Sequence, residues 1–413
     1  MRPDTDAALS LLTAAAVRER ANLMLEAGLA DRLAHFRINL DRLDDAADLV
    51  VAVTRAAYPS LDIPFHSRWR HFVIDGVDRW AAIAATAAWP DAAARARAEF
   101  DLAIVSVLLD AGAGPDWHYR DPLTGREIGR SEGLAAASLA MFGDGLFSES
   151  SRDPLRVDAA RLCELTEAAL VNGFRAGPAN PLTGIAGRAD LLRRLGRTVA
   201  AVPSLFARAG EPRPGGLFDH LASLAHHGGG KIAAATILAE LLRHLGPVWP
   251  SRIALGGIPL GDCWRHPAIT IGDATDGLMP LHKLSQWLAY SLIEPMERAG
   301  IAVVDLSGLT GLAEYRNGGL FIDTGVLAFR DGAAVGGRHS VDSPLVVEWR
   351  ALTVALIDRL AGLVRQRLGR DAEALPLPKI LQGGTWAAGR AIAQRLRGDG
   401  SGPVRVISDG TVF

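Results

Sequence analysis

Apolar residues recur at every third or fourth position over most of the chain, which is the spacing that lines one face of an α-helix. The longest stretch of this kind runs from residue 344 to 368, and an alanine-rich one covers residues 92–109. Shorter helical stretches occupy residues 8–16, 40–51, 80–89, 233–245 and 280–296. The pattern predicts a mainly α protein with a few short β-strands.

The clearest β-strand pattern lies at the end of the chain. Val404, Val406 and Val412 surround the pair Asp409-Gly410, which is typical of a tight turn between antiparallel strands. This pattern predicts a C-terminal β-hairpin. Because an isolated hairpin is only marginally stable in water, we expect it to pack on the rest of the protein, close to Trp386.

Two segments rich in Gly and Pro, residues 172–187 and 211–216, interrupt the helical pattern. We place the main boundary at the first of them. The sequence then predicts an N-terminal helical subdomain at residues 1–172 and a C-terminal one, with the hairpin, at residues 173–413. We expect the two to form one compact unit with the functional site between them.

Composition narrows the possible functions. The chain of 413 residues is 49% hydrophobic and 22% charged, as in folded globular proteins. The 44 Lys and Arg nearly balance the 46 Asp and Glu, so the overall charge does not favour nucleic acid as a partner. Cys163 and Cys263 are far apart, and no apolar run reaches the length of a membrane span. We therefore expect a cytoplasmic protein without a membrane partner.

Several familiar catalytic motifs are absent from the sequence. The segment His226-His-Gly-Gly-Gly-Lys231 lacks the spacing of a P-loop, and Gly256-Gly-Ile-Pro-Leu-Gly261 is not a dinucleotide-binding fingerprint. Neither HExxH nor GxSxG occurs. These absences argue against a nucleoside triphosphatase, a dinucleotide-dependent enzyme, a zinc protease of this type and an α/β-hydrolase.

The segment Glu314-Tyr-Arg-Asn317 places a carboxylate, an aromatic ring, a guanidinium and an amide side by side in otherwise apolar sequence. Charged residues are rarely buried unless they are paired. One interpretation is an internal Glu–Arg pair that stabilises the fold, and Arg316 with Glu348 is a second possible brace. The other is a reactive site, in which Glu314 acts as a base while Arg316 and Asn317 position the substrate.

Three further polar clusters are candidates for substrate binding. Each has a structural alternative, such as a loop anchored by hydrogen bonds or a solvated helix start. A helix start with a nearby Lys can also bind phosphate. The first cluster contains His66, Arg68, Arg70 and His71, the second Trp117, His118, Arg130 and Glu132, and the third His282, Lys283 and Gln286.

The chain resembles the family encoded with the uracil-catabolism (URC) genes of fungi and bacteria. The resemblance covers nearly the full length and is carried by His66-Ser-Arg-Trp-Arg-His-Phe72, by residues 107–120, by Arg130-Ser-Glu-Gly-Leu-Ala135 and by the ending from Gln382 onward. It implies a role in a pathway that opens the pyrimidine ring while ribose is still attached, which leaves a ribosylurea-like intermediate.

About a third of the chain is also similar to the queuosine-salvage proteins, which are N-glycosidases of a 5′-phosphorylated nucleoside. The similar segments are residues 281–288, Leu309-Thr-Gly-Leu-Ala-Glu-Tyr-Arg316, residues 325–327 and residues 347–351. This resemblance implies a helical architecture related to the DNA glycosylases. It departs at Glu314, where the family has Asp, and the extra methylene moves the carboxylate by about 1 Å.

Together the two resemblances imply an enzyme, an N-ribosyl hydrolase that releases urea from a ribosylurea-like, 5′-phosphorylated nucleoside. We predict Glu314 and Asp305 as catalytic carboxylates. Substrate binding would involve Tyr315, Arg316 and Asn317 together with the three clusters above. No cofactor or metal is expected, and the partner is a small molecule, with a possible association with other uracil-catabolic enzymes.

Two alternatives remain open. One is a metal-dependent amidohydrolase or deaminase of the same pathway, with ligands drawn from His66, His71, Asp116, His118 and Asp262. The other is a non-enzymatic partner of the uracil-catabolic enzymes, which would show an exposed apolar patch instead of a closed site around Glu314.

Overall fold

The computed structural model describes residues 3–114, 116–208, 210–250 and 252–407. The chain folds into two compact units, each built from separate segments. Among the described residues, the first unit comprises residues 3–66, 252–286 and 305–407, and the second comprises residues 67–250 and 287–304. The subdomain boundary after residue 172 remains a prediction from the sequence.

Helices dominate both units, which confirms the mainly α prediction. The first unit contains the helices α1 (Pro3–Leu11), α2 (Ala14–Leu29), η1 (Leu40–Arg42), α3 (Leu43–Ala57), η5 (Leu306–Gly308), α14 (Tyr315–Asp323), η6 (Gly332–Ala334), α15 (Pro344–Leu368), α16 (Leu377–Ile380), η7 (Leu381–Thr385) and α17 (Trp386–Arg397). Helix α13 (Lys283–Arg298) gives its first four residues to this unit and the others to the second.

The second unit contains the helices η2 (Arg68–Phe72), α4 (Arg79–Thr86), α5 (Ala92–Leu108), α6 (Arg130–Gly143), α7 (Ala159–Cys163), α8 (Glu167–Gly173), α9 (Ile185–Ala200), α10 (Pro203–Phe206), η3 (Pro214–Gly216), α11 (Leu217–His227), α12 (Ala234–Leu245) and η4 (Gly246–Val248). Among the described helices, none has both the length and the apolar content that a membrane span requires.

The described strands are short and occur in pairs. Antiparallel pairs join β1 (Phe36–Ile38) to β12 (Leu327–Phe329), β9 (Cys263–Arg265) to β10 (Leu278–Pro280), β2 (Val73–Ile74) to β3 (Val77–Asp78), β4 (His118–Arg120) to β5 (Glu127–Gly129), and β7 (Ala254–Leu255) to β8 (Ile258–Pro259). Parallel pairs join β6 (Lys231–Ala233) to β11 (Ala302–Val304) and β13 (Arg338–Ser340) to β14 (Arg405–Ile407).

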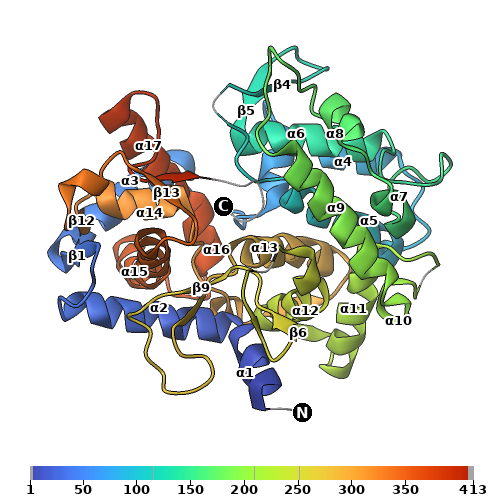
Figure 1. Cartoon of the computed structure of the whole chain (residues 1–413). Helices are drawn as coiled ribbons and strands as arrows, with labels where there is room; N and C mark the ends of the chain where they lie inside the picture. The colour runs from blue at the N-terminus through green and yellow to red at the C-terminus, as the bar shows by residue number, and fades with distance from the viewer. Residues whose placement is uncertain (1–2, 115, 209, 251, 408–413) are drawn as a thin grey trace. The chain divides into compact units, whose positions relative to one another are not determined.

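Helix α15 forms the centre of the first unit and packs against α2 and α3 (Figure 1). Its bounds agree with the predicted helix at residues 344–368. Pro344 occupies the first turn, the Ser343 hydroxyl accepts a hydrogen bond from the Val346 amide, and Gly369 ends the helix in the left-handed conformation. Burial of each large aliphatic side chain along this helix contributes about 1.5–3 kcal/mol.

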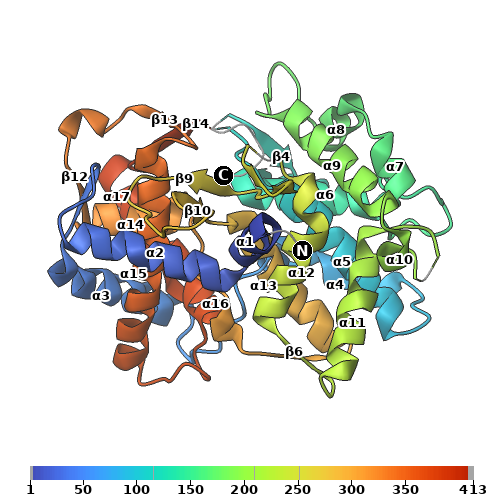
Figure 2. The same ribbon diagram turned by 60° about the horizontal axis from the view of Figure 1, so that its bottom comes forward.

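Helix α5 has the corresponding place in the second unit, where α6, α11 and η3 contact it (Figure 2). Asp91 caps its start by accepting a hydrogen bond of 2.7 Å from the Ala94 amide. Twelve of its residues are buried, among them the acid Asp101. The Arg213 guanidinium and the Val157 amide donate to the Asp101 carboxylate, which provides this buried acid with partners.

The predicted C-terminal hairpin lies mainly outside the described residues, because its turn and second strand fall in residues 408–413. The part that is described, β14, pairs in parallel with β13 and belongs to the first unit. Trp386 begins helix α17 of the same unit.

The start of one helix differs from the prediction. The helix expected from Pro280 begins instead at Lys283, because residues 278–280 pair with β9 as strand β10. Helix α6 begins at Arg130, and Ser131 lies inside its first turn, where it does not act as the cap. The Ser131 hydroxyl instead donates to the carboxylate of Asp110.

The close packing of α17 on α14 can be tested at Gly389. A methyl group there would overlap the carbonyl oxygen of Arg316, so Gly389→Ala should lower the free energy of unfolding by about 1–3 kcal/mol. Gly362→Ala in α15 is the matched control, because nothing lies near the added methyl group, and it should stabilise by up to about 1 kcal/mol. Denaturant unfolding of both variants would measure the difference, and equal effects would contradict the packing.

Candidate functional site

A buried ion pair between Asp262 and Arg350 lies in the first unit. The guanidinium donates two parallel hydrogen bonds of 2.8 Å, one to each carboxylate oxygen. The Trp264 indole and the backbone amide of Lys283 donate to the same carboxylate, at 2.6 and 2.9 Å. Burial alone would raise the pKa of Asp262, but the charge and hydrogen bonds of Arg350 lower it to about 2. The pair is therefore ionised and fully hydrogen-bonded.

This ion pair positions two of the predicted site residues. Through its backbone amide, Lys283 is attached to Asp262 at the start of α13. The Nε of Arg350 donates at 3.2 Å to the carbonyl oxygen of Ala313, the residue directly before Glu314. One buried pair thus holds the backbone beside both Lys283 and Glu314.

Glu314 is the N-cap residue of α14. Its two carboxylate oxygens accept hydrogen bonds from the backbone amides of Arg316, at 2.7 Å, and of Asn317. Only 7% of the residue is exposed. Burial raises the pKa of the carboxyl group above its ordinary value, while these amide bonds and the charge of Lys283 act in the opposite direction. Glu314 is thus a fixed, nearly dehydrated carboxylate at the positive end of a helix.

The charge of Lys283 also affects the pKa of His66. Burial lowers the pKa of His66 to about 4, a hydrogen bond with Gln382 opposes that change, and the charge of Lys283 lowers the pKa further. The Nδ1 atom lies 3.0 Å from the amide oxygen of Gln382, which can only accept, so this nitrogen carries the ring proton. We call His66, Lys283 and Glu314 the Glu314 cluster. It combines a neutral imidazole, an ammonium group and a carboxylate.

Two buried polar atoms beside the Glu314 cluster lack a hydrogen-bond partner among the described residues. Arg316 donates at 2.6 Å to the carbonyl oxygen of Gly400, and its guanidinium lies over the Tyr315 ring. Asn317 donates at 3.2 Å to the carbonyl oxygen of Leu312. Within the described part of the chain, the Nε of Arg316 and the Oδ1 of Asn317 are buried without a hydrogen-bond partner. Such atoms are uncommon in folded proteins, and a bound ligand would satisfy them.

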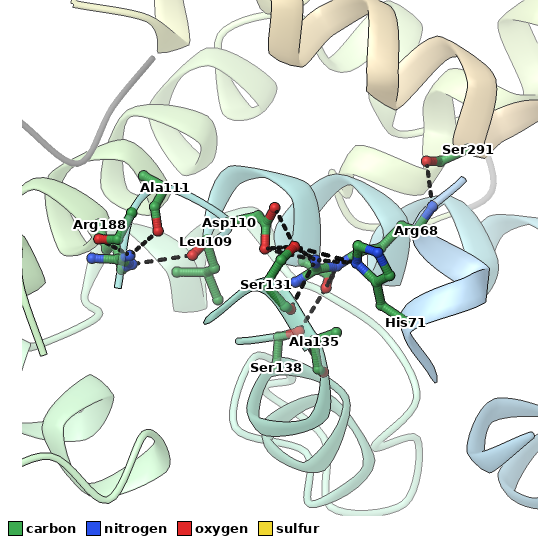
Figure 3. A network of polar contacts seen from close by, with 12 residues as sticks. Arg68, His71, Leu109, Asp110, Ala111, Ser131, Ala135, Ser138, Arg188 and Ser291 are labelled. Carbon is green, nitrogen blue, oxygen red and sulfur yellow. Dashed lines mark hydrogen bonds and ion pairs between the residues drawn. The ribbon is translucent and has the colours of Figure 1, made fainter. Parts of the chain in front are cut away.

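A second polar cluster lies in the second unit (Figure 3). The fully buried Arg68 donates at 2.7 Å to Asp110, and the Ser131 hydroxyl lies 2.7 and 2.8 Å from the two oxygens of the same carboxylate. The Nδ1 atom of His71 lies 3.2 Å from Arg68 and 3.3 Å from Ser131. We call these four residues the Arg68 network.

Arg68 also determines the tautomer of His71 in this network. A guanidinium can only donate, so the Nδ1 of His71 accepts and the ring proton is on Nε2. Burial lowers the pKa of Arg68, but the charges of Asp110 and Glu132 favour the cation. On the opposite side, the Nε of Arg68 donates to Ser106, whose hydroxyl bonds Ser138 at 2.6 Å. The network is thus a buried cation held by one close carboxylate and by hydroxyl groups.

Other residues predicted for the site have structural partners. His282 is buried, and its Nε2 lies 3.0 Å from the carbonyl oxygen of Leu11. Both ends of the Gln286 amide bind Thr310. The buried Trp117 donates at 3.2 Å to the carbonyl oxygen of Phe174. Arg70 forms an ion pair with Glu294.

Three predicted residues lie in more open positions. His118 on β4 and Arg130 at the start of α6 are exposed. Asp305 is also exposed and precedes η5 in the left-handed conformation, while Glu314 is buried. The candidate residues of the sequence thus fall into two groups, one around Glu314 and one around Arg68, with several others outside both.

The proposed brace between Arg316 and Glu348 is wrong. Arg316 binds the carbonyl oxygen of Gly400, and Glu348 accepts hydrogen bonds from the backbone amides of His35 and Phe36, at 3.1 and 2.8 Å. A helix start that binds phosphate was also expected at Lys283, but the Asp262 carboxylate already accepts the backbone amide of that residue.

Comparison with known proteins adds to this geometry. The family described as a protein of unknown function, DUF1688, matches residues 10–413 of the chain. The chain belongs to this family. Among its relatives is protein urg3 of Schizosaccharomyces pombe, which is 38% identical over 99% of this chain and 100% of that protein. Uracil catabolism protein 4 of Lachancea kluyveri is 36% identical over 92% of each chain. The predicted resemblance to the URC family is thereby confirmed.

The structure relates the family's segments to one another. Three segments that carry the URC resemblance supply the Arg68 network: residues 66–72 provide Arg68 and His71, residues 107–120 provide Asp110, and residues 130–135 provide Ser131. Asp110 had not been singled out, although an acid directly before a Gly-rich loop is a usable signal. Arg350 was missed as well, and its position between apolar residues of a long helix was the corresponding signal.

The structure also brings together a group of possible metal ligands that the sequence pattern did not indicate. Within the described residues, the one group of three side chains that could hold a metal ion is His220, Glu240 and His244. None of the ligands proposed for a metal-dependent amidohydrolase belongs to it. The available signal was the spacing of Glu240 and His244, which places them one turn apart on one helix.

The ion pair of Asp262 and Arg350 can be tested through stability. Arg350→Met leaves a buried carboxylate without its cation and should cost about 3–5 kcal/mol of unfolding free energy at pH 7. Arg367→Met on the same helix is the matched control, since its partners Asp44 and Asp48 are exposed, and it should cost at most about 1 kcal/mol. Equal losses in denaturant unfolding would contradict the role of the buried pair.

The same pair predicts a dependence on pH. The pKa of Asp262 is about 2 in the folded protein, below its value in the unfolded chain, so its contribution is present above about pH 4. That contribution should be lost as the pH falls from about 4 to 2 and amount to roughly 2 kcal/mol. The difference in unfolding free energy between wild type and Arg350→Met should shrink over this range. A constant difference would contradict the low pKa.

Proposed function

We propose that the protein is an N-ribosyl hydrolase of uracil catabolism that cleaves the N-glycosidic bond of a ribosylurea-like nucleoside, with Glu314 as its catalytic carboxylate. The observation that carries this proposal is the Glu314 cluster. Three titratable side chains from distant parts of the sequence share one electrostatic environment, since the charge of Lys283 acts on both Glu314 and His66. Titratable groups perturbed in this way concentrate at functional sites.

The reaction needs the kind of group that Glu314 offers. Cleavage of an N-glycosidic bond passes through a state with positive charge on the anomeric carbon, which a nearby carboxylate stabilises. The C–N bond breaks with its electron pair on nitrogen, and a water molecule adds to the carbon. Overall, the hydroxyl group of the water is added to the anomeric carbon, and the remaining proton of the water is transferred to the nitrogen of urea. Glu314 stabilises the positive charge and takes up the proton of the attacking water, a role that its raised pKa favours.

The remaining groups bind the substrate. Lys283 supplies a positive charge close to Glu314 and is our candidate for the 5′-phosphate. The unpaired buried atoms of Arg316 and Asn317 would bind hydroxyl groups of the ribose. Binding energy from these distant contacts holds the anomeric carbon against the carboxylate.

A comparison with a relative supports the pathway, and a resemblance predicted from the sequence motivates the reaction. A relative that matches over nearly the whole chain is named for uracil catabolism. The resemblance to the queuosine-salvage proteins, with Glu314 at the position of their Asp, is a prediction from the sequence, and it favours a glycosidase with a related helical architecture. The direct test is to incubate the purified protein with ribosylurea and with its 5′-phosphate and to assay urea and sugar. We expect release of urea, and no release from either compound would overturn the proposal.

Replacement of the Glu314 carboxylate should affect turnover much more than the free energy of unfolding. Glu314→Gln keeps the size of the side chain and should lower turnover by a factor on the order of 100 or more. Loss of the cap should cost about 1 kcal/mol. The control Asp78→Asn makes the same change at the exposed N-cap of α4 and should leave turnover unchanged.

Glu314→Asp covers the case in which the Gln variant does not fold. Asp caps helices well and retains the charge, so this variant should fold and keep more activity than Glu314→Gln. Full turnover in a folded Glu314→Gln protein would remove Glu314 from the reaction.

The role of Lys283 predicts a dependence on the phosphate. Lys283→Met should lower kcat/KM for the 5′-phosphate by a factor on the order of 100 and affect the unphosphorylated compound far less, since a charged hydrogen bond is worth about 1.5–3 kcal/mol. Lys231→Met, at an exposed lysine of the second unit, is the control and should leave both substrates unaffected. If kcat/KM fell equally for the two compounds, Lys283 would act through its charge on Glu314 and would not bind the phosphate.

A further inference from the structure

A second set of titratable side chains, unrelated to the Glu314 cluster, lies on two helices of the second unit. His220 belongs to α11, while Glu240 and His244 are one turn apart on α12. One oxygen of Glu240 lies 2.7 Å from the Nε2 of His220 and 3.0 Å from the Nε2 of His244. The rings meet edge to face, with their centres 5.3 Å apart. Both imidazoles therefore direct the same nitrogen to one point.

The separations of these three atoms suit a metal ion. The two nitrogens and the carboxylate oxygen all lie within 4.8 Å of one another. Ligands at about 2.0–2.1 Å from a Zn²⁺ ion in tetrahedral geometry are separated from each other by roughly 3.3 Å. Small side-chain rotations would thus bring all three into a first coordination shell. Two imidazoles and one carboxylate are a donor set that suits divalent transition metals.

The three groups can be reached from solvent. The His220, Glu240 and His244 side chains are 19%, 10% and 22% exposed, so an ion can enter and its remaining positions would face solvent. Arg243 also binds Glu240, at 3.1 Å, but its side chain is 57% exposed and can move away.

We propose that His220, Glu240 and His244 bind one divalent transition-metal ion, with Zn²⁺ as the preferred class, and that the ion joins α11 to α12 while at least one coordination position stays open. The two helices are separated in sequence by a short segment that contains β6. A metal would therefore link both ends of this helix–strand–helix element. This site is separate from the Glu314 cluster and does not depend on the proposed hydrolase activity.

The test is to titrate the metal-free full chain with Zn²⁺ and to measure binding by calorimetry. The metal content of the protein is then determined after dialysis. We expect one Zn²⁺ per chain and a rise in thermal stability with added Zn²⁺. His244→Ala and Glu240→Gln should weaken Zn²⁺ binding on the order of 100-fold or more, since each removes a ligand. His226→Ala is the matched control, because this exposed histidine of α11 is not part of the group, and it should bind Zn²⁺ like the wild type.

Arg243→Ala distinguishes a metal site from an ion-pair cluster even if a ligand variant fails to fold. Removal of the competing cation should tighten Zn²⁺ binding several-fold, because the Glu240 carboxylate no longer has to exchange partners. Failure of the folded wild type to bind one Zn²⁺ would overturn the proposal. So would equal binding by the wild type and a folded His244→Ala protein, or unchanged binding in Arg243→Ala.

Discussion

The first unit depends on the buried ion pair of Asp262 and Arg350. Removal of two charges from water costs several kcal/mol per ion, and mutual attraction offsets this only if the geometry is good and the other oxygen positions are hydrogen-bonded. The bidentate contact and the bonds from Trp264 and the Lys283 amide meet this condition. Since Arg350 also binds the carbonyl oxygen of Ala313, the pair fixes the backbone next to Glu314. The buried ion pair and the proposed reactive group, Glu314, are thus connected through the backbone at Ala313.

Arginine recurs wherever this protein buries a cation. Only three of the 44 basic residues are lysines, and Arg68, Arg188 and Arg350 are all nearly inaccessible. A planar guanidinium spreads its charge and donates to several acceptors at once, so it can be satisfied in an interior where an ammonium group would not be. Arg188 illustrates this through its bonds to the carbonyl oxygens of Leu109 and Ala111 (Figure 3). Lys283 is only partly buried and therefore does not belong to this group.

In our proposal, Glu314 combines two roles that usually fall to different residues. As the cap of α14 it satisfies two backbone amides, and these bonds hold its oxygens in place. A catalytic carboxylate needs the same fixed orientation, since reorganisation during the reaction would add to the barrier. Glutamate is not a preferred N-cap residue, and Asp would cap more simply. Its use here is consistent with a demand on the position of the carboxylate beyond that of the helix.

The sequence by itself determined the helical class and the bounds of the longest helix, because apolar periodicity, Pro344 and Gly369 act over a few neighbouring residues. It also singled out Glu314 and the family's segments, since charged residues in apolar surroundings and long motifs are visible without coordinates. Only the tertiary structure decided which polar residues become partners. Arg350 forms its ion pair with Asp262, 88 residues away. Arg316 donates to the backbone carbonyl of Gly400 and does not pair with Glu348. Such choices depend on distances between elements remote in sequence, which no local pattern encodes.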